Sequence, residues 1–432
     1  MHLGLAELIL IFFIALILLG PAVLPRMQRW LRRRGKQVAK SRRARAAEAA
    51  AAQREWDAHM KRLRKKLLAA GGLLLGGWLV YLLLHPVPVV PVAYHASSSA
   101  FSGSYTANSA LDAAESYALQ PYSAPVCVRR HGGWLYMAVS GGQVVRMQED
   151  GTDLSVVLST GGEIVAFDFL SDGRMLLVGS DPIGVGGSVM IAAPDGWNSQ
   201  VVAQPVQLET TETPISFLSA LCVGPDDRVF FAVAHGVPAA ENTMEDAYTL
   251  ALLAHRADSV VYELDLRTGE MQPVLTGLTL ATGLTLDETG EMLYVADAGT
   301  GTVWQLSADA HGLKAGNRDV TAVLQNLPGR PAGLACGSNG RLWVTLSGET
   351  PAWLNALAGL PRLRQAVMNL PALTRNRLIL GGRTAVLAFD AEGEILENWQ
   401  SDAMAAVTGV IETENRVYFA QGTGSALHWR EY

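Results

Sequence analysis

Cysteine is scarce in this chain, which has three among 432 residues. So few cysteines exclude a disulfide-stabilised scaffold and any zinc module built on several cysteines. Charged residues make up 17% and apolar residues 49%, a balance that excludes a disordered chain. The G-x-S-x-G and H-E-x-x-H motifs are missing, and the glycine-rich stretch 183–188 follows no strand-to-helix switch that would form a phosphate-binding loop. The length allows two or three domains, or one large β domain with additions.

The few charges that are present are sharply segregated. Residues 26–66 hold 16 basic and 3 acidic residues, whereas residues 67–432 hold 18 basic and 36 acidic residues. One basic block and one large acidic body therefore face different surroundings. An acidic body excludes nucleic acid as a partner, because the phosphate backbone requires a positive protein surface.

Two long apolar runs near the N-terminus predict a membrane hairpin. Residues 3–24 are apolar except for Glu7, and residues 67–85 contain no Asp, Glu, Lys or Arg. Helices of this length match the ~30 Å hydrocarbon core of a bilayer. We therefore expect transmembrane helices at 1–25 and 67–85, joined by a helical basic loop at 26–66.

The basic loop sets the expected orientation. Short loops rich in Lys and Arg stay in the cytoplasm. The N-terminus and everything after the second helix then lie on the periplasmic side of a bacterial inner membrane, with the lipid bilayer as the first partner. A cleaved signal peptide is the weaker interpretation of residues 1–25, because no basic residues precede the apolar run.

Residues 5–38 resemble the A-type subunit of the twin-arginine translocase. The shared features are the early Glu7, a short apolar helix, the Gly20–Pro21 step, and a basic amphipathic stretch after Pro25. The second apolar run and the large acidic body depart from that family. The resemblance therefore implies a membrane architecture and not protein translocation.

Proline and serine mark the segment at 86–110, which is interpreted as a linker. Pro86, Pro88 and Pro91 predict a stiff extended stalk, and the small polar residues after it predict a flexible tether. Regular structure is expected from residue 111 onward.

A strand–turn–strand pattern recurs through residues 111–432 and predicts an all-β six-bladed β-propeller. The six units begin at residues 125, 164, 218, 281, 331 and 407. Because the last unit has only about three strands, we expect a strand from residues 110–122 to complete it and close the ring.

Two insertions interrupt the repeat, at 236–258 and 349–377. The second has apolar residues at helical spacing, and both are expected over the same face of the propeller. They are either a lid that shapes a pocket or a packed cap over the apolar strand ends.

Three segments carry a resemblance to a known family. They are SFLSALCVGPDDRVFFAVA (216–234), the stretch 276–306, and LPGRPAGLACGSNGRLWVTLSG (327–348). By their order and spacing, about seven tenths of the chain resembles the strictosidine-synthase-like proteins, within the wider superfamily of gluconolactonase and senescence-marker-type propellers. The resemblance is strongest to the membrane-anchored branch of the adipocyte plasma-membrane-associated protein.

This resemblance also implies where a site would lie. Hydrolytic members hold a calcium ion in the central channel through four oxygen-bearing side chains, and the metal polarises an ester or lactone carbonyl. The corresponding positions here are Val126, Ser219, Thr282 and Ala332, and the catalytic glutamate of strictosidine synthase corresponds to Thr408. Val and Ala cannot bind a metal, and Thr is not a proton acceptor. We therefore expect no metal and no cofactor.

Three further residues are candidates for the mouth of the pocket. Asp297 follows an apolar strand and is either an acid in the pocket or a turn residue bound to the backbone of 298–301. His235 and His255 flank the first insertion, and each either lines the pocket or has a structural role.

The cysteines are expected to be free and buried. Cys127, Cys222 and Cys336 are expected at equivalent places in three non-adjacent units, too far apart for a disulfide.

The sequence favours a binding protein over an enzyme, with a small or lipidic molecule or a partner protein bound at the lidded face. The candidate pocket comprises Ser219, His235, His255, Thr282, Asp297 and Thr408. Two alternatives stay open. One is a hydrolase of esters or lactones with a non-standard site. The other is a structural subunit of a membrane complex, in which Gly72 and Gly76 form a helix contact.

Overall fold

The computed structural model describes residues 42–84, 87, 89–96, 100–180, 187–193, 199–203, 217–234 and 244–432. The expected membrane helix at 1–25, the first part of the basic loop and His235 lie outside the described residues. The chain divides into two compact units, residues 1–86 with 369–371 and residues 87–368 with 372–432.

The described part of the first unit is one long helix, α2 (Arg42–Leu84). Alanine, leucine, lysine and arginine dominate this segment, and all four favour helix. The helix continues without a break from the basic loop into the second apolar run, where the sequence predicts two elements. In the part of the chain that the structure describes, no helix is both long and apolar enough to cross a membrane.

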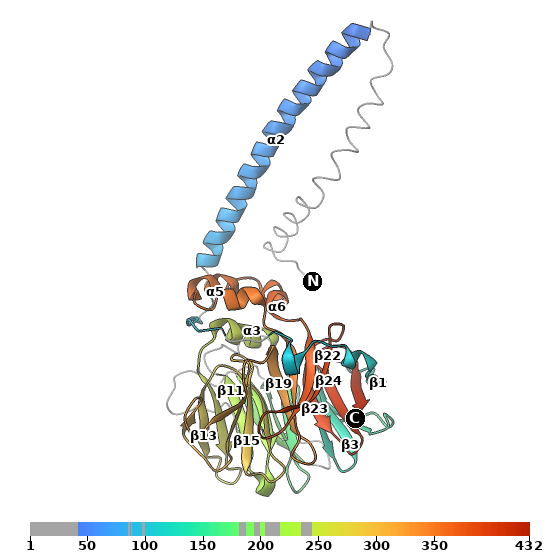
Figure 1. Ribbon diagram of the computed structural model, residues 1–432, viewed down its shortest axis with the longest axis vertical. Coiled ribbons are helices and arrows are strands. Elements are labelled where there is room, and N and C mark those ends of the chain that lie inside the picture. Colours follow the sequence, from blue (N-terminus) through green and yellow to red (C-terminus); the bar gives the residue numbers. More distant parts are fainter. Residues whose placement is uncertain are drawn as a thin grey trace. The chain divides into compact units, whose positions relative to one another are not determined.

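The second unit is a β-propeller, in which the described residues form six sheets (Figure 1). Blades 1 to 3 consist of β2 (Cys127–His131), β3 (Trp134–Val139), β4 (Gln143–Gln148) and β5 (Ser155–Ser159); β6 (Ile164–Phe169), β7 (Met175–Ser180), β8 (Gly187–Ala192) and β9 (Ser199–Ala203); and β10 (Phe217–Val223), β11 (Val229–Ala234), β12 (Ser259–Leu264) and β13 (Met271–Leu278), with β17 (Leu313–Lys314) at its edge. The predicted six-bladed fold is confirmed.

Blades 4 to 6 complete the circle. They consist of β14 (Ala281–Leu286), β15 (Met292–Asp297), β16 (Thr302–Ser307) and β18 (Thr321–Leu324); β19 (Gly329–Cys336), β20 (Leu342–Glu349), β21 (Thr384–Phe389) and β22 (Ile395–Ser401); and β23 (Val407–Glu412), β24 (Arg416–Gln421) and β25 (Ala426–Glu431) with β1 (Glu115–Ala118). Tyr117 of β1 pairs with Leu427 of β25. The expected closure by an N-terminal strand is therefore confirmed, and it gives the sixth blade its fourth strand.

Apolar side chains fill the interfaces between neighbouring blades. Alternation along each strand presents one set of side chains to each neighbour. Tyr294 packs with Phe389 between blades 4 and 5, and Trp343 packs with Phe419 between blades 5 and 6. Fully burying a large apolar side chain contributes roughly 1.5–3 kcal/mol, so these interfaces hold the ring together.

Four helices from the two insertions form a cap over one end of the propeller (Figure 1). The first insertion supplies α3 (Met244–Ala254), and the second supplies α4 (Ala352–Ala356), α5 (Pro361–Met368) and α6 (Ala372–Ile379). Helix α3 packs against α5 and α6, as expected for insertions over the same face. Leu253, Met368 and Ile379 are buried in this packing, so the cap has an apolar core of its own.

The segment expected to be a linker packs against the second unit instead. Val89 is buried in the core of the cap, and the Val92 amide donates to the Ala254 carbonyl over 2.9 Å. Further along, the Asn108 amide donates to the Asn398 carbonyl, and Arg383 donates to the Asn108 carbonyl over 2.7 Å. The proline-rich segment therefore lies along the edge of the cap, and its backbone groups form hydrogen bonds with the cap.

Candidate functional site

The innermost strands of the six blades form a closed ring at the centre of the propeller. Each of β2, β6, β10, β14, β19 and β23 contacts its neighbours on both sides. In blades 3, 4 and 6 the pairing with the second strand shifts at Ser219, Thr282 and Thr408, and in blade 5 it shifts across Ala332. A β-bulge re-aims the side chain at the shift, so these predicted site residues occupy equivalent irregular positions.

The hydroxyl groups at these bulges bind backbone carbonyls. Thr282 Oγ1 donates to the Pro331 carbonyl over 2.8 Å, and Thr408 Oγ1 donates to the Val126 carbonyl over 2.9 Å. Both bonds cross from one blade to the next. Ser219 Oγ donates within its own blade, to the Ala232 carbonyl over 3.4 Å. The two bulge threonines therefore join neighbouring blades.

A glycine after the bulge allows the blades to approach closely. A Cβ placed on Gly333 would lie 3.1 Å from Gly409 Cα and even closer to the Thr408 carbonyl oxygen. Both atoms belong to the backbone of the neighbouring blade. A side chain at Gly333 would consequently force the two inner strands apart.

The residues that the resemblance places at metal positions do not fit a calcium ion. Calcium requires six to eight oxygen ligands, mainly carboxylates and carbonyls. Val126 and Ala332 have no side-chain oxygen, and Ser219 and Thr282 offer only neutral hydroxyls, which are poor calcium ligands. Across the described ranges, no group of three or more His, Cys, Asp and Glu side chains is placed to hold a metal ion. The Thr408 hydroxyl, at the position of the catalytic glutamate, is likewise a donor to a carbonyl.

Asp297 is a buried turn residue. It is fully buried at the end of β15, and its carboxylate accepts hydrogen bonds from the backbone amides of Thr279, Leu280 and Gly299 at 2.9–3.1 Å. Three amide donors occupy the carboxylate, so it is not directed at a ligand. Of the two interpretations of Asp297, the structure favours the turn.

A small pocket of about 50 Å³ lies between the cap and the ends of blades 4 and 5. Its walls include Tyr94, His255, Thr300 and Arg330. His255, one of the predicted pocket residues, is among them. The pocket does not include Ser219, Thr282, Asp297 or Thr408, so the predicted pocket residues divide between the central ring and the cap.

His255 forms the wall of the pocket at the C-terminal end of α3. Its amide donates to the Ala251 carbonyl, and its ring stacks on Tyr94 with a centroid distance of 3.4 Å. Burial, together with the positive charge of nearby Arg364, lowers the pKa of His255 to about 3. The imidazole is therefore neutral at physiological pH.

Two buried arginines flank this pocket, and sequence reasoning missed both. Arg330 donates to the carbonyls of Glu349 and Gly381, and its Nε has no partner among the described residues. Arg364 donates to carbonyls that include those of Val92 and Leu253, and its guanidinium lies 4.7 Å from the centroid of the Tyr94 ring. Arg364 lies in the second insertion, where Glu349 is the one acidic residue, and this shortage of acidic residues was the sequence signal that could have indicated Arg364.

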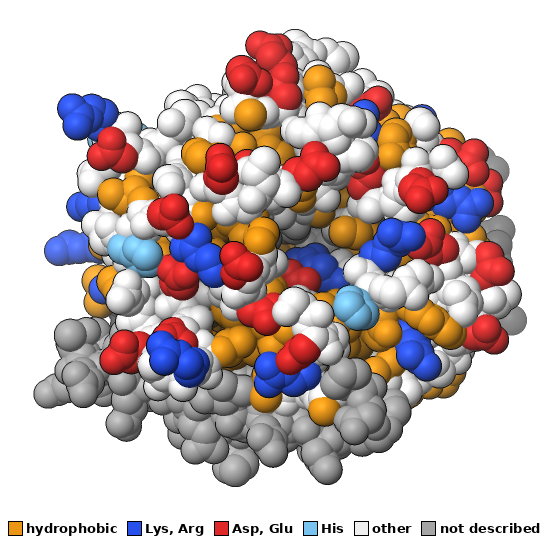
Figure 2. All heavy atoms as spheres, turned by 90° about the horizontal axis from the view of Figure 1, so that it is seen from below, with side chains coloured by type: hydrophobic (Ala, Val, Ile, Leu, Met, Phe, Trp, Pro, Cys, Tyr) orange, Lys and Arg blue, Asp and Glu red, His pale blue; other side chains and the backbone are white. Residues whose placement is uncertain are grey.

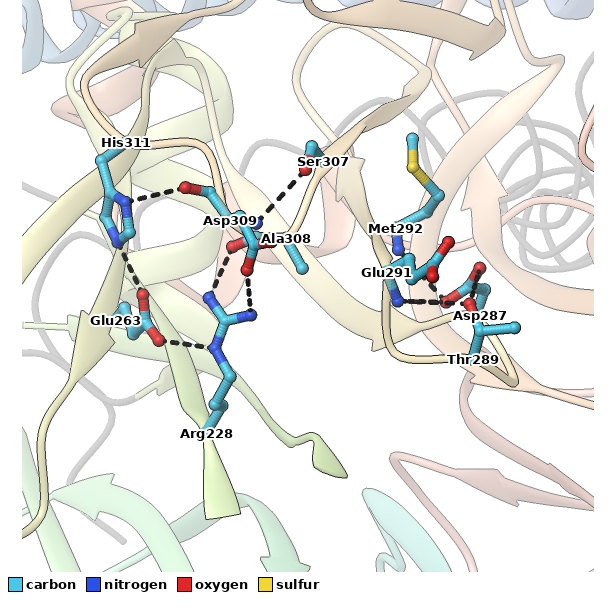
Figure 3. Close-up of polar contacts among 10 residues, drawn as sticks. All are labelled: Arg228, Glu263, Asp287, Thr289, Glu291, Met292, Ser307, Ala308, Asp309 and His311. Atoms are coloured by element: carbon cyan, nitrogen blue, oxygen red, sulfur yellow. Dashed lines mark hydrogen bonds and ion pairs between the residues drawn. The ribbon is translucent and has the colours of Figure 1, made fainter. Parts of the chain in front are cut away.

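A separate polar network joins blades 3 and 4 at the other end of the propeller (Figure 3). Arg228 donates to Glu263 over 2.8 Å and to Asp309 over 2.7 Å, and the His311 ring lies 2.6 Å from Glu263. Burial alone would raise the pKa of Glu263, but the hydrogen bonds from Arg228 and His311 outweigh it and lower the pKa. Arg228 is paired with carboxylates of both blades, so the network fastens the two blades together.

The three cysteines are free thiols in the described structure. Cys127 and Cys222 are buried, whereas Cys336 is only half-buried. The expectation of equivalent positions was wrong, because Cys127 begins its strand and the other two lie near the ends of theirs. Burial raises the pKa of the Cys336 thiol to about 11, so it is a weak nucleophile.

Residues 124–359 match the family described as SMP-30/gluconolactonase/LRE-like region. The chain belongs to this family. Residues 1–41 match the mttA/Hcf106 family, which includes the translocase subunits that the N-terminus resembles. Both resemblances seen in the sequence are thus confirmed at the level of the family.

Several solved structures are similar to this chain. A luciferin-regenerating enzyme shares 11% identity over 73% of this chain and 91% of its own, with a TM-score of 0.48. Regucalcin, a calcium-binding protein from Agrobacterium tumefaciens, shares 10% identity over 72% and 90%, with a TM-score of 0.46. Virginiamycin B lyase from Staphylococcus aureus shares 10% identity over 74% and 99%, with a TM-score of 0.44. No curated protein matches the chain.

Proposed function

We propose that this protein is a membrane-anchored binding protein of the SMP-30/gluconolactonase/LRE-like family that does not use the family's metal chemistry. The propeller receives a small or lipidic ligand at its capped face. The chain is held in a bacterial inner membrane by helices at 1–25 and 67–85, with the propeller in the periplasm.

The central ring is the observation that carries this proposal. A Lewis-acid hydrolase needs a metal ion beside the reacting carbonyl. Here Val126 and Ala332 offer no ligand atom, and Thr282 and Thr408 donate their hydroxyls to neighbouring carbonyls. The ring is used for closure of the propeller, and the cap offers the alternative place for a ligand.

Calorimetric titration of the full-length protein with calcium in nonionic detergent tests the absence of the metal site. We expect no saturable heat at micromolar calcium. One site with micromolar affinity would support a metal-dependent hydrolase and contradict the proposal. Native mass spectrometry of the same preparation tests the binding function, since a molecule retained from the cell would appear as a discrete mass increment.

The membrane anchor is supported by the match of residues 1–41 to the mttA/Hcf106 family and by the two apolar runs. Cysteine labelling tests the topology. In spheroplasts, a membrane-impermeant maleimide should label Arg318→Cys but not Arg54→Cys, each in a Cys336→Ser background. Labelling of Arg54→Cys alone would reverse the orientation.

A further inference from the structure

Two guanidinium groups beside the capped pocket are buried without a counter-ion. Arg330 is 2% exposed and Arg364 is fully buried. Both donate only to backbone carbonyls, and no Asp or Glu in the described ranges forms an ion pair with either one. A charge removed from water is costly unless an opposite charge compensates it.

The pocket between these arginines is itself free of acidic side chains. It is lined by thirteen residues, none of them Asp or Glu, in a body where acidic residues outnumber basic ones two to one. His255 is neutral, so it adds no charge to the pocket and does not compensate the arginines. The two arginines contribute positive potential to the pocket, and the buried Asp297 carboxylate, which accepts from the Gly299 amide in the pocket wall, offsets part of it.

Two residues that line the pocket have hydrogen-bond donors without a partner among the described residues. Arg330 Nε and Thr300 Oγ1 are both buried and have no partner among the residues that the structure describes. Both residues line the pocket. A buried donor without a partner loses its hydration with no compensation, so an acceptor that reaches either group would satisfy it.

We propose that this pocket binds the carboxylate group of an organic acid, with Arg330 and Thr300 as its hydrogen-bond donors. The proposal rests on the proposed function and names its ligand class. A carboxylate accepts hydrogen bonds at both of its oxygens, and bonds to a charged acceptor are stronger than bonds to a neutral one. A volume of about 50 Å³ holds such a head group only, so the remainder of the acid extends out of the pocket.

Calorimetry on the full-length protein in nonionic detergent tests this proposal with three probes at one ionic strength. The probes are sodium hexanoate, its neutral isostere hexanamide, and sodium phosphate. We expect hexanoate to bind and the other two not to bind. Equal affinity for hexanamide would remove the role of charge, and equal affinity for phosphate would remove the assignment to carboxylates.

Variants locate the site. Thr300→Val keeps the shape of the side chain and should weaken hexanoate binding at least tenfold, because a hydrogen bond to a charged acceptor is lost. Arg330→Gln should abolish binding. Arg318→Gln removes an exposed arginine, 94% accessible, and should bind like the wild type. Unchanged affinity in Thr300→Val would overturn the proposal even if Arg330→Gln failed to fold.

Native mass spectrometry separates this inference from the proposed function. If hexanoate does not bind but the purified protein retains a neutral molecule, the carboxylate assignment fails and the binding function stands. If hexanoate does not bind and no molecule is retained, both fail.

The outer face of the cap carries a second and independent signal. Residues 350–383 contain five arginines and no Asp or Glu. Four large apolar side chains in this stretch are 44–54% exposed, namely Leu360, Leu363, Leu373 and Leu378. Figure 2 shows the opposite end of the propeller, where acidic and basic side chains are interspersed.

The burial pattern places these leucines away from the propeller. On α5, Arg364 and Met368 are buried, and on α6 Arg375 and Ile379 are buried, on the sides that pack against α3. The leucines and the exposed Arg362 and Arg377 therefore form an outward face, here called the cap surface.

We infer that the cap surface lies on an anionic lipid bilayer. Leucine and arginine on helices without acidic residues are typical of interfacial segments, in which apolar groups enter the head-group region and arginines bind lipid phosphates. The chain enters the cap at Val87, three positions after Leu84, where the second apolar run ends.

Fluorescence quenching by nitroxide-labelled lipids in nanodiscs tests this inference on the full-length chain. A fluorophore at Leu363→Cys, in a Cys336→Ser background, should be quenched several times more than one at Arg318→Cys, in the connection between β17 and β18. Replacing phosphatidylglycerol by phosphatidylcholine, or adding Arg362→Gln and Arg377→Gln, should reduce the difference. Equal quenching at the two positions would overturn the inference.

Discussion

The contact between the inner strands of blades 5 and 6 predicts that Gly333→Ala is strongly destabilising. The new Cβ would lie 3.1 Å from Gly409 Cα and closer still to the Thr408 carbonyl oxygen. Neither backbone atom can rotate away, so relief requires a shift of whole strands. Overpacking typically costs about 1–3 kcal/mol, and we expect the upper end of that range here.

Thermal unfolding of the full-length protein in detergent, followed by tryptophan fluorescence, measures this loss. For a body of this size a loss of about 3 kcal/mol corresponds to a fall in Tm of roughly 4 °C. Gly359→Ala is the matched control, because a Cβ there meets nothing within 4 Å. It should leave Tm unchanged or raise it slightly, since alanine lowers the entropy of the unfolded chain.

Equal Tm values for the two variants would refute the reasoning. They would mean that the inner strands can separate without cost, and that the bonds donated by Thr282 and Thr408 do not hold the ring closed. The inner ring would then have no demonstrated role in closing the propeller.

Three further predictions follow from individual groups. Asp297→Asn should lower the free energy of unfolding by about 2–3 kcal/mol in urea titrations, because the bonds from three amides to a charged acceptor are lost. The pKa of His255 is lowered to about 3 in the native protein, so below about pH 6.5 the unfolded chain binds a proton that the native protein does not. The free energy of unfolding should therefore fall by up to ~1.4 kcal/mol per pH unit on acidification. His255→Gln should reduce this slope. Thiol labelling of the unfolded, unreduced protein should give three reactive groups, and a lower number would show a disulfide that the free thiols of the structure do not allow.

The propeller could be predicted from the sequence because its signals are local and repeated. Each unit carries its own alternating strands and polar turn, and the incomplete last unit pointed to the strand that closes it, Glu115–Ala118. The insertions broke this repeat, so their place above one face could also be predicted. For Asp297, the adjoining turn residues were sufficient to raise the correct alternative.

The capped pocket could not be predicted in the same way, because contacts between distant segments create it. Arg364 binds the carbonyls of Val92 and Leu253, which are 272 and 111 positions away. Tyr94 lies in a segment whose prolines are typical of a linker, yet it stacks on His255. Periodicity reports which face of an element is apolar, but it does not report which remote carbonyl will receive a buried arginine.

The pairing of Tyr117 with Leu427 has a consequence for biogenesis. The chain emerges from the ribosome N-terminus first, so β1 is made long before its partner β25. Until the final strands are made, the ring is open, and both β1 and the unfinished sixth blade have strand edges with unpaired backbone groups. Such edges can pair with other chains. A nonsense mutation ahead of Ala426 would leave the ring permanently open. Quality-control proteases should then remove the protein, even though five blades are intact.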